Sequence, residues 1–209
     1  MPVVTVTSDW SKRDFYAGAL VGGLLGLASV YEITHQIHPF DVRMGVFVLR
    51  QAFTRFPAGS MHILAVQAQA TDQLPMSVAF YQGHYIITVN DGRFSLLFDN
   101  EPQWIRAVYA APGTFSEQEA YIKAVRAIVE DKLQEMTLPA DMKTEVRPSA
   151  VAEKDYIMGQ VIYIDSYGNA ITNISRSLFD RVGAGRDFRI FLQGPYTRIE
   201  KISDSYGGV

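Results

Sequence analysis

Cysteine is absent from this chain of 209 residues. Its absence excludes disulfides, thiolate metal sites and cysteine nucleophiles, although a protein without disulfides can occupy any compartment. Positive charge is not in excess either, because 19 Lys and Arg residues face 22 Asp and Glu residues and leave a net charge of -3. The chain therefore has no basic footprint for a nucleic acid partner. Its 48% of hydrophobic residues is typical of a globular protein and argues against intrinsic disorder.

A hydrophobic run long enough to cross a membrane is also lacking. The one candidate, the uncharged stretch of 17 residues at 15–31, contains four glycines and is shorter than a spanning helix, which needs about 20 residues. The first residues alternate like a strand and carry no basic leader. We expect a soluble, cytoplasmic protein with no membrane partner.

The common catalytic motifs are missing as well. The chain has no glycine-rich phosphate loop, no GxSxG elbow and no HExxH pair. His35 and His38 are close enough in sequence to suggest a metal, but Pro39 follows directly and no third ligand is evident. His62 begins an expected strand and His84 lies in an expected turn. We therefore expect no metal site and no bound cofactor.

Strands and helices alternate through the first 140 residues. Apolar and β-branched runs predict strands at residues 3–7, 30–33, 61–66, 78–81 and 85–89, the last two joined as a hairpin. Helical spacing predicts helices after Asp14, after Pro39 and from Ser116 to Met136. This alternation predicts an α/β N-terminal domain at 1–140, with a mostly parallel sheet flanked by helices.

Two of these helices begin with capping signals. Asp14 is expected to cap the first helix, and Ser116 with Glu119 has the spacing of a capping box. Glycines in the first helix would allow a close approach to a neighbour. Its buried face is predicted to consist of Phe15, Tyr16, Ala19, Leu20 and Gly23.

The pattern changes after residue 140. Prolines and charges at 139–148 indicate a linker, and strands are expected at 159–165 and 188–192 with a turn at 167–170. Residues 141–209 thus predict a linker followed by a small, barrel-like all-β C-terminal domain. At this length such a domain is at the lower limit of independent stability, so we expect it to be incomplete or to depend on the first domain for its stability.

Asp9 is the most informative single residue. It directly follows the first strand and precedes a helix, at the edge where open α/β sheets bind ligands. A carboxylate there can accept hydrogen bonds from both hydroxyls of a ribose. The alternative is a turn residue that supports the next helix.

A second candidate lies in the turn around Tyr167 and Asn169. The asparagine amide offers a donor and an acceptor, which suits an adenine edge, and the tyrosine ring can stack on a base. The alternative is an ordinary β-turn in which Gly168 adopts a positive φ and Asn169 bonds its own backbone.

Four segments together resemble one family. Residues 8–18, with Ser8-Asp9-Trp10 and Asp14-Phe15-Tyr16, are similar to its opening motif, and residues 32–41 resemble its aspartate-isoleucine-threonine-histidine motif. Residues 85–92 correspond to its proline-aspartate-asparagine-glycine turn, and residues 165–173 are similar to its aspartate-x-phenylalanine-glycine-asparagine signature. The family is the S-adenosyl-L-methionine (SAM) hydroxide adenosyltransferases, relatives of the SAM-dependent fluorinase and chlorinase.

The resemblance implies an α/β domain, a small β-barrel domain and a homotrimer with sites between subunits. Members bind SAM and let water or a halide attack the ribose C5′, which expels methionine. The sulfonium is already a good leaving group, so the protein mainly positions the reactants and desolvates the nucleophile. By the resemblance, Asp9 holds the ribose diol, Phe40 packs near the sugar, and Tyr167 and Asn169 hold the adenine.

The chain departs from the family where members orient water. The family uses an aspartate and an arginine from one loop and a histidine from another. At these positions Gln67 replaces the aspartate, Leu74 and Pro75 replace the arginine, and Ser116 replaces the histidine. A glutamine cannot act as a base near neutral pH. We expect the last barrel segment of the family, which contacts the methionine part, to be missing from this chain.

Three functions follow from this comparison. The first is a divergent member that binds SAM or adenosine with weak or no turnover, as a sensor or partner subunit. The second is an active SAM-cleaving enzyme in which rearranged residues such as Gln67, Asp72 or Ser116 handle the nucleophile. The third is a non-catalytic oligomeric relative whose pocket has closed.

Overall fold

The computed structural model describes residues 1–111, 113–192, 194 and 198–202. The chain divides into two compact units, Met1–Arg147 and Pro148–Val209. Within the described residues no helix is long and apolar enough to cross a membrane.

The first unit is built on a seven-stranded sheet with the order β2-β1-β3-β5-β4-β6-β7. Strands β2, β1, β3 and β5 pair in parallel, and β4 runs antiparallel to both of its neighbours, so β6 points in the same direction as β5. Only β4 and β7 oppose the common direction. The predicted α/β class with a mostly parallel sheet is confirmed. The strands are β1 (Val3–Ser8), β2 (Ser29–Thr34), β3 (Met61–Ala65), β4 (Met76–Tyr81), β5 (His84–Val89), β6 (Trp104–Val108) and β7 (Leu138–Pro139).

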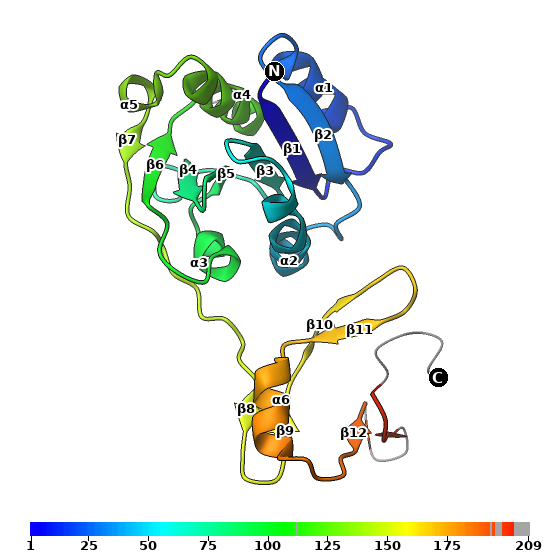
Figure 1. Ribbon diagram of the computed structural model, residues 1–209. Helices are drawn as coiled ribbons and strands as arrows, with labels where there is room; N and C mark the ends of the chain where they lie inside the picture. The colour runs from blue at the N-terminus through cyan, green and yellow to red at the C-terminus, as the bar shows by residue number, and fades with distance from the viewer. Residues whose placement is uncertain (112, 193, 195–197, 203–209) are drawn as a thin grey trace. The chain divides into compact units, whose positions relative to one another are not determined.

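Helices cover both faces of this sheet (Figure 1). Helices α1 and α4 pack over one face around Leu20, Leu24 and Tyr121, and α2 and α3 pack over the other around Leu49 and Phe94. Strand β3 is buried along its whole length, as expected for a strand covered on both sides. The helices are α1 (Tyr16–Leu24), α2 (Val42–Ala52), the 3-10 helix η1 (Phe53–Arg55), α3 (Arg93–Leu97), α4 (Ser116–Val129) and α5 (Leu133–Met136).

Two predicted helix starts are wrong. Helix α1 is capped by Phe15, not Asp14, and α4 by Phe115, so Ser116 is already the first helical residue; neither start has a side-chain cap. A capping box needs its serine one position before the helix, in an extended conformation. By contrast, Asp41 caps α2 by accepting a hydrogen bond from the next turn.

The length of α4 and the buried face of α1 also differ from their predictions. Helix α4 ends at Val129 because Asp131 adopts a left-handed conformation, with φ of 56°, that separates it from α5. Helix α1 buries only Leu20 and Leu24, and Phe15 is 61% exposed. The close approach is real at Gly23, where an added Cβ would lie 2.3 Å from a side chain of α4.

The segment predicted as a linker belongs to the first unit up to Arg147. Asn90 donates to the carbonyl oxygen of Asp141 and accepts from the N–H of Lys143. Arg147 forms an ion pair with Asp99 at 3.1 Å. These bonds attach the segment to the α/β unit, which is why the division follows Arg147 instead of residue 140.

The second unit is β-rich. Three two-stranded antiparallel ribbons pair β8 with β9, β10 with β11, and β12 with β13. It also contains a helix, α6, which the all-β prediction did not include and which Ser175 caps. None of its described side chains is buried, so these residues form no core of their own. Its elements are β8 (Val151–Ala152), β9 (Ile157–Met158), β10 (Val161–Ile164), β11 (Ala170–Thr172), α6 (Arg176–Gly183), β12 (Ile190–Phe191) and β13 (Arg198–Ile199).

Candidate functional site

The candidate site lies where the parallel strands of the first unit end. Strands β2, β1, β3 and β5 are neighbours and point the same way, so their carboxyl ends meet at one edge of the sheet. The residues that follow these strands are His35, Asp9, Gln67 and Asp91. Open α/β sheets bind their ligands at this edge.

Asp9 is held in place by two backbone N–H groups. Its Oδ2 accepts from Phe40 at 3.0 Å and from Gln67 at 3.3 Å. Both donors have left-handed backbones, with φ of 66° and 44°, a conformation that costs a non-glycine residue about 1–3 kcal/mol. No described residue donates to Oδ1. The structure thus brings Asp9, Phe40 and Gln67 together and leaves Oδ1 without a donor among the described residues.

His35 anchors the next strand end. Its Nδ1 lies 2.6 Å from the hydroxyl of Ser8, and its carbonyl oxygen accepts from the N–H of Ser11. Burial lowers the pKa of the His35 imidazole, an effect that Glu32 partly opposes. Ser8 also accepts from the N–H of Trp10, so this side chain supports the turn that carries Asp9.

A buried ion pair lies at the end of β5. Arg93 and Asp91 are 2.6 Å apart, and 1% of the Arg93 side chain is exposed against 29% of the Asp91 side chain. Burial by itself would raise the pKa of Asp91, but hydrogen bonds and the charge of Arg93 outweigh it and hold that pKa below its usual value. Asp91 therefore remains ionised near neutral pH.

Aromatic side chains lie beside Asp9. Trp10 contacts Tyr16 at 6.3 Å and Tyr121 at 6.4 Å between ring centroids. Phe15 is close to Tyr16 and to Phe115, and both phenylalanines are more than one third exposed. These rings are an accessible apolar surface that could contact a planar or apolar ligand group.

The positions that replace the water-orienting residues of the family are dispersed. Gln67 joins the Asp9 contact through its backbone, and its side chain is exposed. Leu74 closes a turn with Thr71 and packs against the core, and Ser116 begins α4. The Leu74 side chain has no hydrogen-bonding atom, and among the described residues no hydrogen bond links the Ser116 side chain to Asp9.

The turn with Tyr167 and Asn169 belongs to the second unit. Asp165 organises it: its Oδ1 accepts from both backbone N–H groups, and its Oδ2 accepts from the Asn169 side chain at 2.7 Å. Gly168 has φ of 84°, as the turn interpretation requires. The Asn169 side chain thus bonds Asp165. Tyr167 is 85% exposed.

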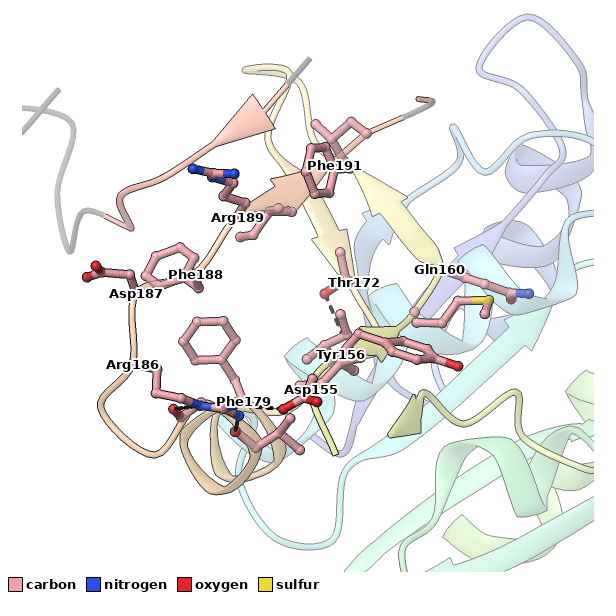
Figure 2. Close-up of a pocket in the computed structure, with 18 of the residues that line it drawn as sticks. Asp155, Tyr156, Gln160, Thr172, Phe179, Arg186, Asp187, Phe188, Arg189 and Phe191 are labelled. Carbon is pink, nitrogen blue, oxygen red and sulfur yellow. Dashed lines mark hydrogen bonds and ion pairs between the residues drawn. The ribbon is translucent and has the colours of Figure 1, made fainter. Parts of the chain in front are cut away.

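The second unit also contains a pocket of about 680 Å³ (Figure 2). It is mostly apolar, and Phe179 and Phe188 meet edge to face at its wall. Arg186 pairs with Asp155 at 2.9 Å at one side. Neither Tyr167 nor Asn169 lines this pocket. Because no described side chain of this unit is buried, the residues that line the pocket are all at least partly exposed to solvent.

Metal ligands do not cluster in the described part of the chain, where no three His, Asp or Glu side chains are placed to share an ion. Sequence reasoning missed Arg93 and His35 as members of this edge. The signal was available for His35, which directly follows a parallel strand as Asp9 does, whereas Arg93 begins α3.

Two family models match this chain. Residues 4–137 match the model of the SAM hydroxide adenosyltransferase N-terminal domain, and residues 159–209 match that of its C-terminal domain. The chain is 23% identical to the (R)-S-adenosyl-L-methionine hydrolase of Methanocaldococcus jannaschii, covering 84% of this chain and 68% of that protein. It is 26% identical to the same-named protein of Salinispora tropica, covering 97% and 82%.

A solved structure shows the same fold. An uncharacterized conserved protein from Thermotoga maritima superposes with a TM-score of 0.84 at 19% identity, over 99% of this chain and 84% of that one. The two domain models together match most of the sequence, in the order that the resemblance predicted. The chain belongs to the SAM hydroxide adenosyltransferase family.

Proposed function

We propose that this protein binds the adenosyl part of SAM, or adenosine, through Asp9, with weak or no turnover. The observation that carries the proposal is the geometry of Asp9, whose Oδ2 is fixed by two N–H groups while Oδ1 has no donor among the described residues. A carboxylate held in this way is ready to accept hydrogen bonds from a ribose diol without further ordering. Phe40 is 72% exposed beside it, available to pack on the sugar.

Weak turnover follows from the positions that replace the water-orienting set. Gln67 contributes its backbone to the site, Leu74 packs against the core, and Ser116 has no hydrogen bond to Asp9 among the described residues. None of these side chains can carry a charge near neutral pH. The site as described retains the part that would bind the nucleoside more clearly than the part that would orient water.

The second candidate is an active SAM hydrolase, which the names of the two curated relatives favour. In that reaction a water oxygen bonds to the ribose C5′ as the C5′–S bond breaks. The bonding electrons pass to the methionine sulfur, and the water proton goes to solvent. Because the sulfonium leaves readily, correct placement of water supplies much of the rate.

Calorimetric titration with SAM and with adenosine, combined with a methionine assay on the same samples, separates these functions. Binding without methionine release supports the proposal, and binding with release supports the hydrolase. An absence of binding to both ligands would contradict both and leave a structural relative. Ligand at about 100 times its Kd should also add about 2.7 kcal/mol to the free energy of unfolding.

The site assignment is tested by Asp9→Asn. The asparagine oxygen can still accept from Phe40 and Gln67, so the fold should persist, but the negative charge that would attract the ribose hydroxyls is lost. We expect no detectable adenosyl binding. Asp14→Asn is the matched control, because Asp14 is exposed and makes the same change of charge nearby. Equal affinity in the two variants would refute the assignment of Asp9.

The adenine contacts and the trimer are part of the same proposal. Asn169→Ala should weaken adenosine binding, because the amide that would meet the base edge is removed. Light scattering of the full chain measures the oligomeric state, and a mass other than three chains would contradict the trimer.

A further inference from the structure

Arg93 has the largest side chain among the fully buried residues that the structure describes. Its guanidinium donates two hydrogen bonds to the Asp91 carboxylate, from Nε at 2.8 Å and from Nη2 at 2.6 Å. Nη1 donates to the Val66 carbonyl oxygen at 2.7 Å and to the Thr88 hydroxyl at 3.3 Å, and Nη2 donates to the Gln67 carbonyl oxygen at 3.3 Å. A side chain from the first residue of α3 thus binds the backbone that leaves β3.

Stability alone explains such a residue poorly. Removing two charges from water is costly, and a well-packed apolar replacement is often as stable as a buried ion pair. An arginine in this place differs from an apolar residue in its planar fork of donors, which orients several acceptors at once. The useful property of Arg93 is therefore geometric.

Arg93 orients the peptide bond between Val66 and Gln67. Its carbonyl oxygen accepts from Arg93, and its N–H donates to Asp9 at 3.3 Å. A trans peptide is planar, so the direction of the C=O sets the direction of the N–H. Gln67 is also left-handed, with φ of 44°, and such a conformation persists only when its surroundings enforce it.

We propose that Arg93 is a positioning residue for the adenosyl site: by clamping the Val66–Gln67 peptide, it directs the Gln67 N–H at Asp9 and holds that carboxylate in its binding position. Asp91 neutralises the guanidinium and keeps its fork oriented. This inference rests on the proposed function of Asp9 in ligand binding, whereas the clamp itself is a property of the ligand-free protein.

The test compares Arg93→Met with Arg106→Met in the full-length chain. Arg106 is also buried and donates to backbone carbonyls, those of Gln134 and Thr137, but it lies on β6, and its hydrogen bonds to described residues do not reach the Asp9 edge. Both variants lose a buried arginine. By calorimetry, Arg93→Met should bind adenosine and SAM at least about tenfold more weakly than Arg106→Met does.

Arg93→Lys separates charge from geometry. Lysine keeps a cation opposite Asp91 but has no planar fork, so it should restore thermal stability without restoring affinity. Full recovery of affinity in Arg93→Lys would overturn the proposal, since charge alone would then suffice. This comparison also decides the matter if Arg93→Met fails to fold.

Hydrogen exchange tests the clamp without any ligand. The Gln67 amide should exchange faster in Arg93→Met and Arg93→Lys than in the parent chain, and Arg106→Met should leave it unchanged. Unchanged exchange in both Arg93 variants would overturn the inference. If the parent chain binds neither adenosine nor SAM, the proposed function fails, but the exchange comparison still shows whether Arg93 holds this peptide.

Discussion

Mild acid should destabilise this protein through a buried pair of histidines. His62 has none of its surface exposed; its Nδ1 lies 2.7 Å from the Thr5 hydroxyl, and its Nε2 lies 3.1 Å from Nδ1 of His84. The rings of Phe53 and Phe56 pack against it. Burial, with a smaller contribution from His84, lowers the pKa of His62 from 6.5 to about 3.

The direction of the effect follows from this lowered pKa. Between pH 6.5 and pH 3 the unfolded chain binds a proton at His62 that the folded chain does not, so stability is complete above pH 6.5 and falls as the pH falls. From pH 7 to pH 5, His62 alone should remove about 2 kcal/mol, at roughly 1.4 kcal/mol per pH unit once the unfolded histidine is protonated. The pKa of Asp91 is lowered from 3.8, so its titration lies below this window.

Urea unfolding at pH 7 and pH 5 measures this loss. His62→Leu should be less stable at both pH values. Between pH 7 and pH 5, however, its free energy of unfolding should fall by about 2 kcal/mol less than that of the parent chain. His38→Gln is the control, because His38 is exposed and lies outside the pair. If the parent chain and His62→Leu lose the same free energy between pH 7 and pH 5, the argument from the buried pair is refuted.

Three further substitutions test the fold by urea unfolding. Gly92→Ala should cost about 1–3 kcal/mol, because Gly92 has φ of 116° and a Cβ there would lie 2.8 Å from that of Glu145. Tyr121→Phe should cost about 1 kcal/mol, because the buried hydroxyl donates to a β3 carbonyl at 3.3 Å. Asp41→Ala should cost about 1 kcal/mol, because its carboxylate caps α2 at the N–H of Met44, 2.9 Å away. A neutral result in any of these would contradict the contact concerned.

Local sequence patterns were sufficient where one element decides the outcome. The alternation of strands and helices predicted the α/β class, and the expected turn at residues 82–84 predicted the hairpin of β4 and β5, although His84 is already the first residue of β5. The position of Asp9 after the first strand predicted its place at the carboxyl edge of the sheet. In each case the residues concerned are adjacent in sequence, so their pattern carries the information.

Predictions that depended on distant neighbours were less accurate. The apolar residues of α1 suggested a wide buried face, yet Phe15 is 61% exposed, since burial depends on which elements pack over the helix. The capping box at Ser116 had the correct spacing, but the chain enters α4 one residue earlier. A spacing rule does not report where the preceding loop places the first helical residue.

The sequence by itself determined the family, the α/β class and the position of Asp9. Only the tertiary structure showed that Arg93 meets the Val66–Gln67 peptide and that His62 meets His84. These partners lie more than 20 residues apart. Strand order and parallel register bring them together, and both are settled by how the whole sheet buries its apolar surface, not by any pattern within one strand.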